Sequence, residues 1–151
     1  MHQHIDDGKA PVLTRLAARD ILADSAAAAR SLVAAHLRLY TAGPLPNPEM
    51  VIGEFTEATF AGYGSVGPIV WKTPVFDTDA KIARMLADSP SGLFVATGAG
   101  PTENILGYYL TDSLGTVVLA ARQFVAPVLI QHAGDFLDVT PTIILQADVQ
   151  G

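Results

Sequence analysis

The chain has no cysteine among its 151 residues. This absence excludes disulfide bonds, thiolate catalysis and every zinc or iron–sulfur site that is built on cysteine. The core must therefore be held together by packing and hydrogen bonds alone. Charge is sparse as well, because only 16% of the residues are charged whereas 50% are hydrophobic. Such a composition is too apolar for a disordered protein, and it indicates that a partner covers part of the surface.

Cations are few, with 9 Lys and Arg against 15 Asp and Glu and a net charge of −6. Because nonspecific binding to nucleic acid needs clustered cations, we expect no direct contact with nucleic acid. The first residues lack the pattern of a signal peptide, so secretion by that route is not expected. The most apolar runs are 25–37, which Arg30 interrupts, and 116–130, which Arg122 and Pro127 interrupt. Neither offers about 18 uninterrupted apolar residues. We therefore expect no membrane span.

The sequence contains parts of motifs for cofactor binding and catalysis, but each motif lacks residues or structural context that it requires. Residues 62–67 match the glycine spacing G-x-G-x-x-G, but strand-like residues 68–71 follow where a dinucleotide site needs a helix, so a glycine-rich turn is favoured. Glu54 and Glu57 are interpreted as exposed loop acids rather than a catalytic pair. The four histidines are dispersed and predict no zinc triad. We predict no catalytic residue, no metal site and no cofactor, and hence not an enzyme.

The first part of the chain has helical periodicity. Between Leu13 and Leu37, apolar residues recur at steps of three and four, which is typical of an amphipathic helix or two. Thr14 or Pro11 could mark its start. We predict an N-terminal helical arm over residues 1–35. Four apolar residues of this arm are the candidate interface anchors: Leu16, Ile21, Leu32 and Val33.

The periodicity changes to alternation near Tyr40. Leu37 and Leu39 would point to one side of a strand and the residues after them to the other. Beyond a Pro- and Gly-dense link, short apolar runs are separated by turn residues at the intervals of sandwiches and small barrels. We predict a mainly β domain over residues 36–151, an antiparallel β-sandwich or jelly-roll-like barrel. The further predicted strands are 68–72, 81–87, 93–97, 105–112, 116–122, 127–132 and 136–145.

Two local patterns inside this predicted sheet are more specific. Residues 112–115 have the turn chemistry that joins strands 105–112 and 116–122 in a tight hairpin. Tyr108 and Tyr109 are adjacent and must point to opposite faces of a strand, so we expect one in the core and the other exposed or at an interface. Together with Trp71 they are the candidate surface aromatic contacts.

The chain contains four distinctive segments: Leu37–Thr41, Ile52–Tyr63, Gly107–Asp112 and Leu119–Phe124. Together these segments resemble small virion proteins of tailed phages. In that family an opening helix precedes a short strand, an acidic-aromatic segment and a hairpin, and the likeness covers about residues 37–144. The motifs are structural rather than catalytic, so the resemblance implies a part of a virion and assigns no site residue. The alanine-rich arm is longer than in the family pattern.

Our leading hypothesis within this class is a head-decoration or cement protein that docks on the major capsid protein or another virion protein. We expect a homo-oligomer, with a trimer as one option, made in the host cytoplasm and located on the virion. The head surface is favoured over the tail. One alternative is a tail-associated component that binds a receptor or glycan through exposed aromatic rings. Another is an enzyme such as a polysaccharide lyase or a jelly-roll isomerase, which the lack of clustered reactive side chains disfavours.

Overall fold

The computed structural model describes residues 2–5, 11–15, 17, 34–72, 75–77, 82–87, 92–98 and 100–146. Within these ranges the chain forms three β-sheets and one short 3-10 turn, η1 (Ile52–Glu54), so the prediction of a mainly β fold is confirmed. The strands are β1 (His2–Ile5), β2 (Val12–Leu13), β3 (His36–Ala42), β4 (Thr56–Glu57), β5 (Val75–Asp77), β6 (Ile82–Leu86), β7 (Leu93–Val95), β8 (Glu103–Thr111), β9 (Val118–Ile130), β10 (Phe136–Val139) and β11 (Thr142–Gln146).

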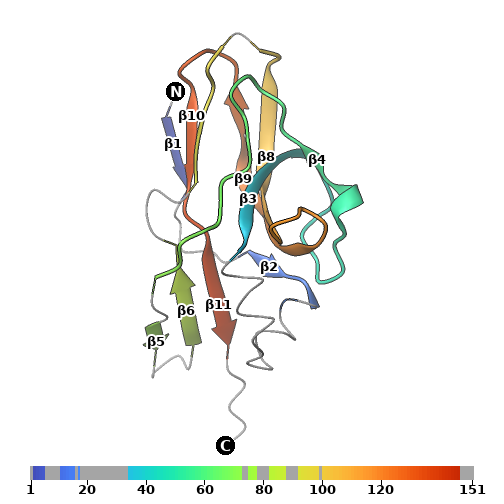
Figure 1. The fold of residues 1–151 in the computed structure, drawn as a ribbon, viewed down its shortest axis with the longest axis vertical. Coiled ribbons are helices and arrows are strands. Elements are labelled where there is room, and N and C mark those ends of the chain that lie inside the picture. The colour runs from blue at the N-terminus through green and yellow to red at the C-terminus, as the bar shows by residue number, and fades with distance from the viewer. Residues whose placement is uncertain are drawn as a thin grey trace, which may run out of the picture.

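The largest sheet has five strands in the order β2-β9-β8-β3-β4, and all its neighbours are antiparallel. The predicted hairpin lies at its centre, since β8 pairs with β9 across the turn that begins at Asp112. The Gly115 N–H donates to the Asp112 carbonyl oxygen at 3.1 Å, and Gly115 has a φ of 70°. A left-handed residue at this point is what glycine supplies without strain. Figure 1 shows β3 and β8 side by side in this sheet.

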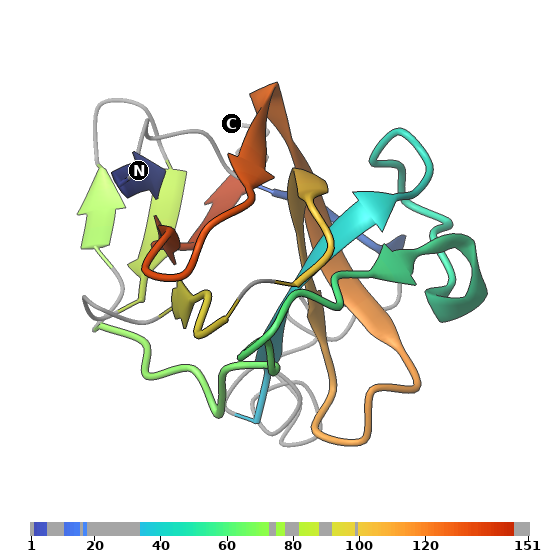
Figure 2. The ribbon, with the colours of Figure 1, turned by 90° about the horizontal axis from the view of Figure 1, so that it is seen from above.

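Two three-stranded sheets complete the fold, in the orders β1-β10-β7 and β11-β6-β5. The predicted strand 136–145 is divided between them, because β10 pairs with β7 and β11 pairs with β6. The break falls at Pro141, which has no N–H for a ladder bond. The prediction of an entirely antiparallel fold is wrong at one point, because β1 pairs with β10 in parallel. In Figure 2 the five-stranded sheet lies on the right and the smaller sheets lie on the left.

The main core lies between the five-stranded sheet and the two smaller sheets. Leu37, Leu39 and Leu110 enter it from the large sheet, while Leu137 and Ile143 enter it from the small sheets. All five side chains are at most 1% exposed. Alternation along β3 is therefore as the sequence predicts, with Leu37 and Leu39 on the same face.

The opposite face of the five-stranded sheet carries a second apolar cluster, built around Tyr40, Met50, Tyr109, Val118 and Ala121. The ring of Phe55 stacks on Tyr109 with centroids 4.5 Å apart and meets Tyr40 edge-on at 5.2 Å. Because the segment that carries Met50 and Phe55 covers this face, the centre of the sheet is buried on both sides.

The N-terminal residues differ from the predicted helical arm at 2–5 and 12–13, whereas Arg15 and Ala17 are helical. His2–Ile5 and Val12–Leu13 are strands, so the expected helical conformation of Leu13 is wrong. Leu13 belongs to the five-stranded sheet, where it pairs with Ala120 of β9. The Thr14 hydroxyl accepts a hydrogen bond from the Ala17 N–H at 3.3 Å, the contact of a helix N-cap. The candidate anchors Leu16, Ile21, Leu32 and Val33 lie outside the described residues.

The long strand β9 replaces two predicted strands, 116–122 and 127–132. Between the pairs Ile105–Val128 and Gly107–Gln123, β8 advances by two residues and β9 by five, so β9 carries a wide bulge. Pro127 lies in this bulge, where the missing N–H costs no ladder bond. The predicted strand 68–72 is reduced to an isolated bridge from Trp71 to Ala87.

Among the described residues, no helix combines the length and the apolar composition that a membrane span requires.

Candidate functional site

Three of the four segments that carry the phage resemblance meet around Arg38. Its Nη1 lies 3.0 Å from Glu57 Oε2 and 3.2 Å from Glu57 Oε1, and its Nε donates to Thr111 Oγ1 at 3.1 Å. The Tyr63 hydroxyl donates to Glu57 Oε2 at 2.7 Å and accepts from the Leu39 N–H at 3.1 Å. We call Arg38, Glu57 and Tyr63 the polar triangle. It fastens β3, β4 and the 60–63 turn to one another.

The phenols near the polar triangle are held in their neutral form. Burial raises the pKa of Tyr63 far above its ordinary value, and the hydrogen bond to Glu57 acts in the same direction. Burial also raises the pKa of Tyr109 to about 12; Glu57 adds to this shift and Arg38 opposes it. Both hydroxyl groups therefore keep their protons across the physiological range. The polar triangle is a fixed hydrogen-bonded brace rather than an acid–base pair.

The interpretation of Glu57 as an exposed loop acid is wrong. It lies in β4, with its side chain 34% exposed and paired with an Arg38 side chain that is 19% exposed. Glu54, in contrast, is exposed on η1 as expected. A sequence signal for this brace existed, because Arg38 stands between Leu37 and Leu39 on the polar side of an alternating strand. When a neighbouring segment covers this face, the guanidinium becomes partly buried, and a partly buried cation is stabilised by a carboxylate partner.

The glycine spacing at 62–67 is explained by packing and not by a phosphate site. Gly62 has a φ of 90° and is the third residue of a turn closed by the Tyr63 N–H and the Phe60 carbonyl at 2.9 Å. Positive φ at that position is the requirement of a type II turn. After the turn, Val66 exchanges two backbone hydrogen bonds with Leu37. The chain thus follows β3 and presents no helix N-terminus at this point.

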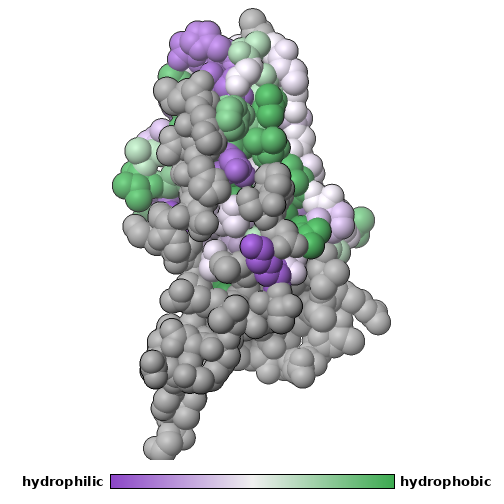
Figure 3. Space-filling model, turned by 90° about the vertical axis from the view of Figure 1, so that its left-hand side faces the viewer, coloured by the Kyte–Doolittle hydropathy of each residue, from purple (hydrophilic) through white to green (hydrophobic). Residues whose placement is uncertain are grey.

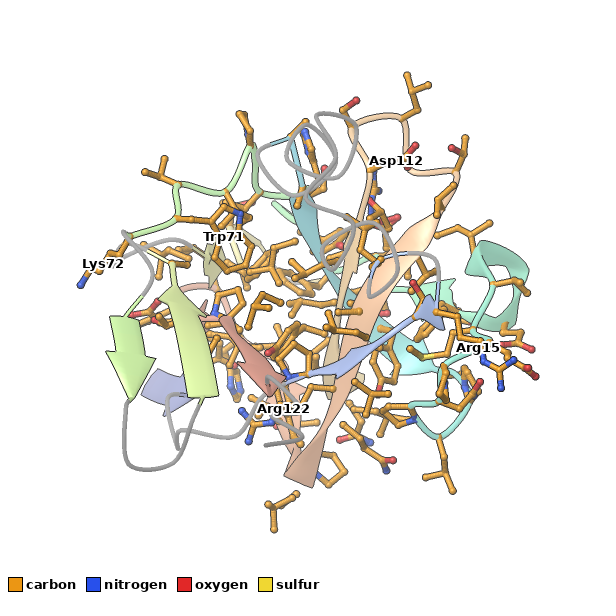
Figure 4. All side chains as sticks on the ribbon, turned by 90° about the horizontal axis from the view of Figure 1, so that it is seen from below. Arg15, Trp71, Lys72, Asp112 and Arg122 are labelled. Atoms are coloured by element: carbon orange, nitrogen blue, oxygen red, sulfur yellow. The ribbon has the colours of Figure 1, made fainter. Side chains whose placement is uncertain are left out.

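An apolar groove lies on the side of the five-stranded sheet where the N-terminal residues leave β2. Its volume is about 280 Å³. Val51 forms an exposed lip, with 57% of its surface accessible, while Met50 and Val118 are buried behind it. Figure 4 shows Arg15 beyond the end of β2, on the side of the molecule away from β5 and β6. We call this groove the η1 groove; it is lined by Thr14, Pro48, Glu49, Met50, Val51, Ile52, Thr116, Val117 and Val118.

The η1 groove has well-anchored walls. The Thr14 N–H donates to the Leu119 carbonyl at 3.0 Å, and the Arg15 N–H donates to the Pro48 carbonyl at 2.9 Å. On the hairpin side, Asp112 accepts hydrogen bonds from the Thr116 N–H at 2.8 Å and the Val117 N–H at 3.1 Å. These bonds tie three separate segments to one sheet. The groove is therefore a preformed feature of the fold.

Further apolar side chains are exposed elsewhere on the molecule. Leu93 and Val95 project from β7 with 45% and 38% of their surfaces accessible, and Val125 projects from the β9 bulge with 84% accessible. Figure 3 shows hydrophobic side chains in the upper part of the face that it displays, beside residues drawn in grey. Apolar contacts with neighbours are thus available to more than one part of the surface.

The candidate aromatic contacts are mostly inside the protein. Tyr108 and Tyr109 do point to opposite faces of β8, but they are 1% and 2% exposed, so the expected surface position of one of them is wrong. Each face of the sheet is covered, which leaves neither ring accessible to a sugar. Trp71 is half-buried and packs against the main core. Figure 4 shows it directed inward, whereas its neighbour Lys72 points to solvent.

A buried carboxylate organises the loop between β9 and β10. Asp135 Oδ2 accepts hydrogen bonds from the backbone N–H groups of Gln131 and His132, both at 2.9 Å. Those bonds, from Gln131 first and then from His132, hold the pKa of Asp135 well below its ordinary value of 3.8. The carboxylate is therefore ionised in the folded protein and favours folding when charged.

Acid is expected to weaken the fold through Asp135. Because its folded pKa is lower than its unfolded one, its stabilisation is complete above the ordinary value of 3.8 and is lost as the pH falls through the folded pKa. The free energy of unfolding from urea titrations should thus fall below about pH 4. Asp135→Asn should make that dependence shallower, while Glu49→Gln, at an exposed carboxylate, serves as the control. An equal slope in wild type and Asp135→Asn would refute this role.

Among the described residues, no three His, Asp or Glu side chains are grouped so that they could hold a metal ion. Comparison of the chain with protein-family models, curated proteins and solved structures finds no match. The site must accordingly be interpreted from its own geometry. That geometry consists of a braced β frame, an apolar groove on one side and exposed apolar side chains on others.

Proposed function

We propose that this chain is a structural protein of a tailed-phage virion, most specifically a decoration or cement protein of the head. The observation that carries the proposal is the η1 groove, an apolar and preformed surface held on a rigid sheet. Such a surface suits docking, because preorganised walls lower the entropy lost when a partner binds. The phage resemblance of the segments that form the polar triangle supports the same assignment.

We infer that the three sheets act as a two-layered β-sandwich or jelly-roll-like barrel and that residues 1–35 include a helical arm. In this proposal Leu16, Ile21, Leu32 and Val33 of the arm contact the major capsid protein, another virion protein or a sibling subunit. Burial of apolar area across such junctions stabilises the assembled state by mass action. Burial of apolar area between copies of the chain would also give a homo-oligomer on the virion, and a trimer is one option.

The proposal assigns no catalytic residue, metal or cofactor to the chain, and no contact with nucleic acid or membrane. Glycan binding by a tail component is the less favoured assignment. Its stacking surface would have come from Tyr108 and Tyr109, and both are buried. The remaining candidate, Trp71, is half-buried against the main core.

Deleting the gene from the phage genome that encodes it tests the proposal. Particles that lack the protein should assemble, yet lose their DNA at a lower temperature or a lower mechanical load than wild-type particles. The expected cause is the loss of intersubunit contacts that stabilise only the assembled shell. Complementation with the wild-type chain should restore the resistance. Unchanged resistance, together with wild-type heads that carry none of the protein, would refute a cement function.

A further inference from the structure

Negative charge gathers around the η1 groove. Glu49 is one of its lining residues, and Glu54 Oε2 accepts a hydrogen bond at 3.4 Å from the N–H of Val51, the exposed lip. Asp112 accepts hydrogen bonds from both Thr116 and Val117 on the other wall. Among the described residues, two cations lie next to these carboxylates. Arg15 Nη1 lies 3.5 Å from Glu49 Oε1, and the Arg38 guanidinium lies beside Gly115 of the Asp112 turn, where it is paired with Glu57. With the Arg38–Glu57 pair included, four described carboxylates stand against two guanidinium groups around the groove, which leaves an excess of negative charge.

The size and lining of the groove limit what it can bind. Its volume of about 280 Å³ lies at or below the ~300–1,000 Å³ of pockets that enclose drug-sized ligands. Its deepest side chains, Met50 and Val118, are apolar and only 4% and 2% exposed. A groove of this size and lining fits one large apolar side chain of a partner, while the acidic groups around it face the residues on either side.

We propose that the η1 groove binds an extended segment of a partner protein in which one large apolar side chain is flanked by Lys or Arg. This inference rests on the proposed docking function and specifies the chemistry of the partner. The apolar side chain supplies affinity through burial, as anchors of protein interfaces do. The flanking cations supply selectivity, because like charges at the same positions would be repelled by Glu49 and Glu54.

Synthetic peptides and the purified full chain test the proposal directly. Three nine-residue peptides on a Gly/Ser background would carry Lys-Leu-Lys, Glu-Leu-Glu or Lys-Ala-Lys at their centre. In NMR titrations of the ¹⁵N-labelled chain, the Lys-Leu-Lys peptide should shift the amide signals of residues 50–52 and 116–118. We expect it to bind about threefold to tenfold more tightly than the Glu-Leu-Glu peptide. It should bind about tenfold more tightly than the Lys-Ala-Lys peptide.

Two matched variants locate the contact. Val51→Ser shortens the exposed lip and should weaken Lys-Leu-Lys binding about threefold, whereas Leu45→Ser should leave it unchanged. Leu45 is 76% exposed in the same segment but is not part of the groove lining. Since both positions are exposed, neither substitution should unfold the protein, which the dispersion of the NMR signals would verify.

Several outcomes would overturn the inference. Equal binding of Lys-Leu-Lys and Glu-Leu-Glu would remove the requirement for cations, and equal binding of Lys-Ala-Lys would remove the apolar anchor. Groove signals that do not move at any peptide concentration would exclude this class of ligand. A change in the sedimentation of the chain itself on Val51→Ser would show that a second copy occupies the groove. None of these results bears on whether the protein is part of a virion, which particle composition decides.

Discussion

Replacing Gly107 with alanine is expected to lower the free energy of unfolding by more than about 3 kcal/mol. A Cβ atom at this position would overlap the Arg122 carbonyl oxygen of β9 and lie 2.6 Å from the Tyr40 hydroxyl of β3. The Tyr40 ring crosses above Gly107, and its hydroxyl donates to the same Arg122 carbonyl at 3.4 Å. The sheet cannot yield locally, because three of its strands meet at this point.

Urea denaturation followed by circular dichroism measures the effect, and Gly64→Ala is the matched control. Gly64 has no atom within 4 Å of an added Cβ. The same substitution there should change the free energy of unfolding by less than about 1 kcal/mol. Equal stabilities of the two variants would mean that the close packing of β3, β8 and β9 is not what holds the sheet. A small loss in Gly107→Ala alone would carry the same meaning.

Replacing Glu57 with alanine is expected to destabilise the protein by about 2 kcal/mol. The change removes the carboxylate that pairs with the guanidinium of Arg38 and accepts the hydrogen bond of Tyr63. Both groups are largely shielded from water, so neither can fully recover its lost interaction from solvent. The destabilisation should therefore exceed that of removing an ordinary surface ion pair, which is worth about 0–1 kcal/mol.

Glu54→Ala is the control for this prediction, because Glu54 is exposed and makes one long hydrogen bond of 3.4 Å. It should cost less than about 0.5 kcal/mol. A double-mutant cycle of Glu57→Ala with Tyr63→Phe should give a coupling energy of about 1 kcal/mol, since the two side chains share a hydrogen bond. Additive effects of the two changes would show that the polar triangle does not act as a unit.

Alternation and turn chemistry made the centre of the large sheet predictable. The pattern around Leu37 and Leu39 indicated β3, and the Asp112–Gly115 turn indicated the pairing of β8 with β9. Both signals are local, since they depend on residues that are close in sequence. The mainly β class followed from them. The phage-like segments also converge in space, although the resemblance itself did not state how.

The strands that form through long-range pairing could not be predicted from the sequence. Val12–Leu13 is two residues long and becomes a strand only because β9 offers it an edge. His2–Ile5 pairs with β10, which lies more than 130 positions later in the chain. No pattern in the residues near either strand predicts that contact. The burial of both tyrosines at 108 and 109 was missed for a similar reason. Alternation places adjacent side chains on opposite faces, but it does not reveal that a distant segment covers the second face.

The η1 groove could not be predicted from the sequence. Its walls come from residues 14, 48–52 and 116–118, which the fold brings together from three parts of the chain. The composition gave only a general signal, because its high apolar content indicated that some surface is covered by a partner. The structure shows an apolar groove among the described residues that is open to solvent. The residues on its rim then indicate which charges the partner should carry.

The position of the protein on phage particles distinguishes a virion structural protein from other functions. Phage particles would be purified and separated into heads and tails, and each fraction would be analysed by quantitative mass spectrometry. The account predicts the protein on heads, at a copy number in fixed proportion to the major capsid protein. Its absence from every purified particle, or turnover of a substrate by the isolated chain, would contradict a function that depends on surface contact alone.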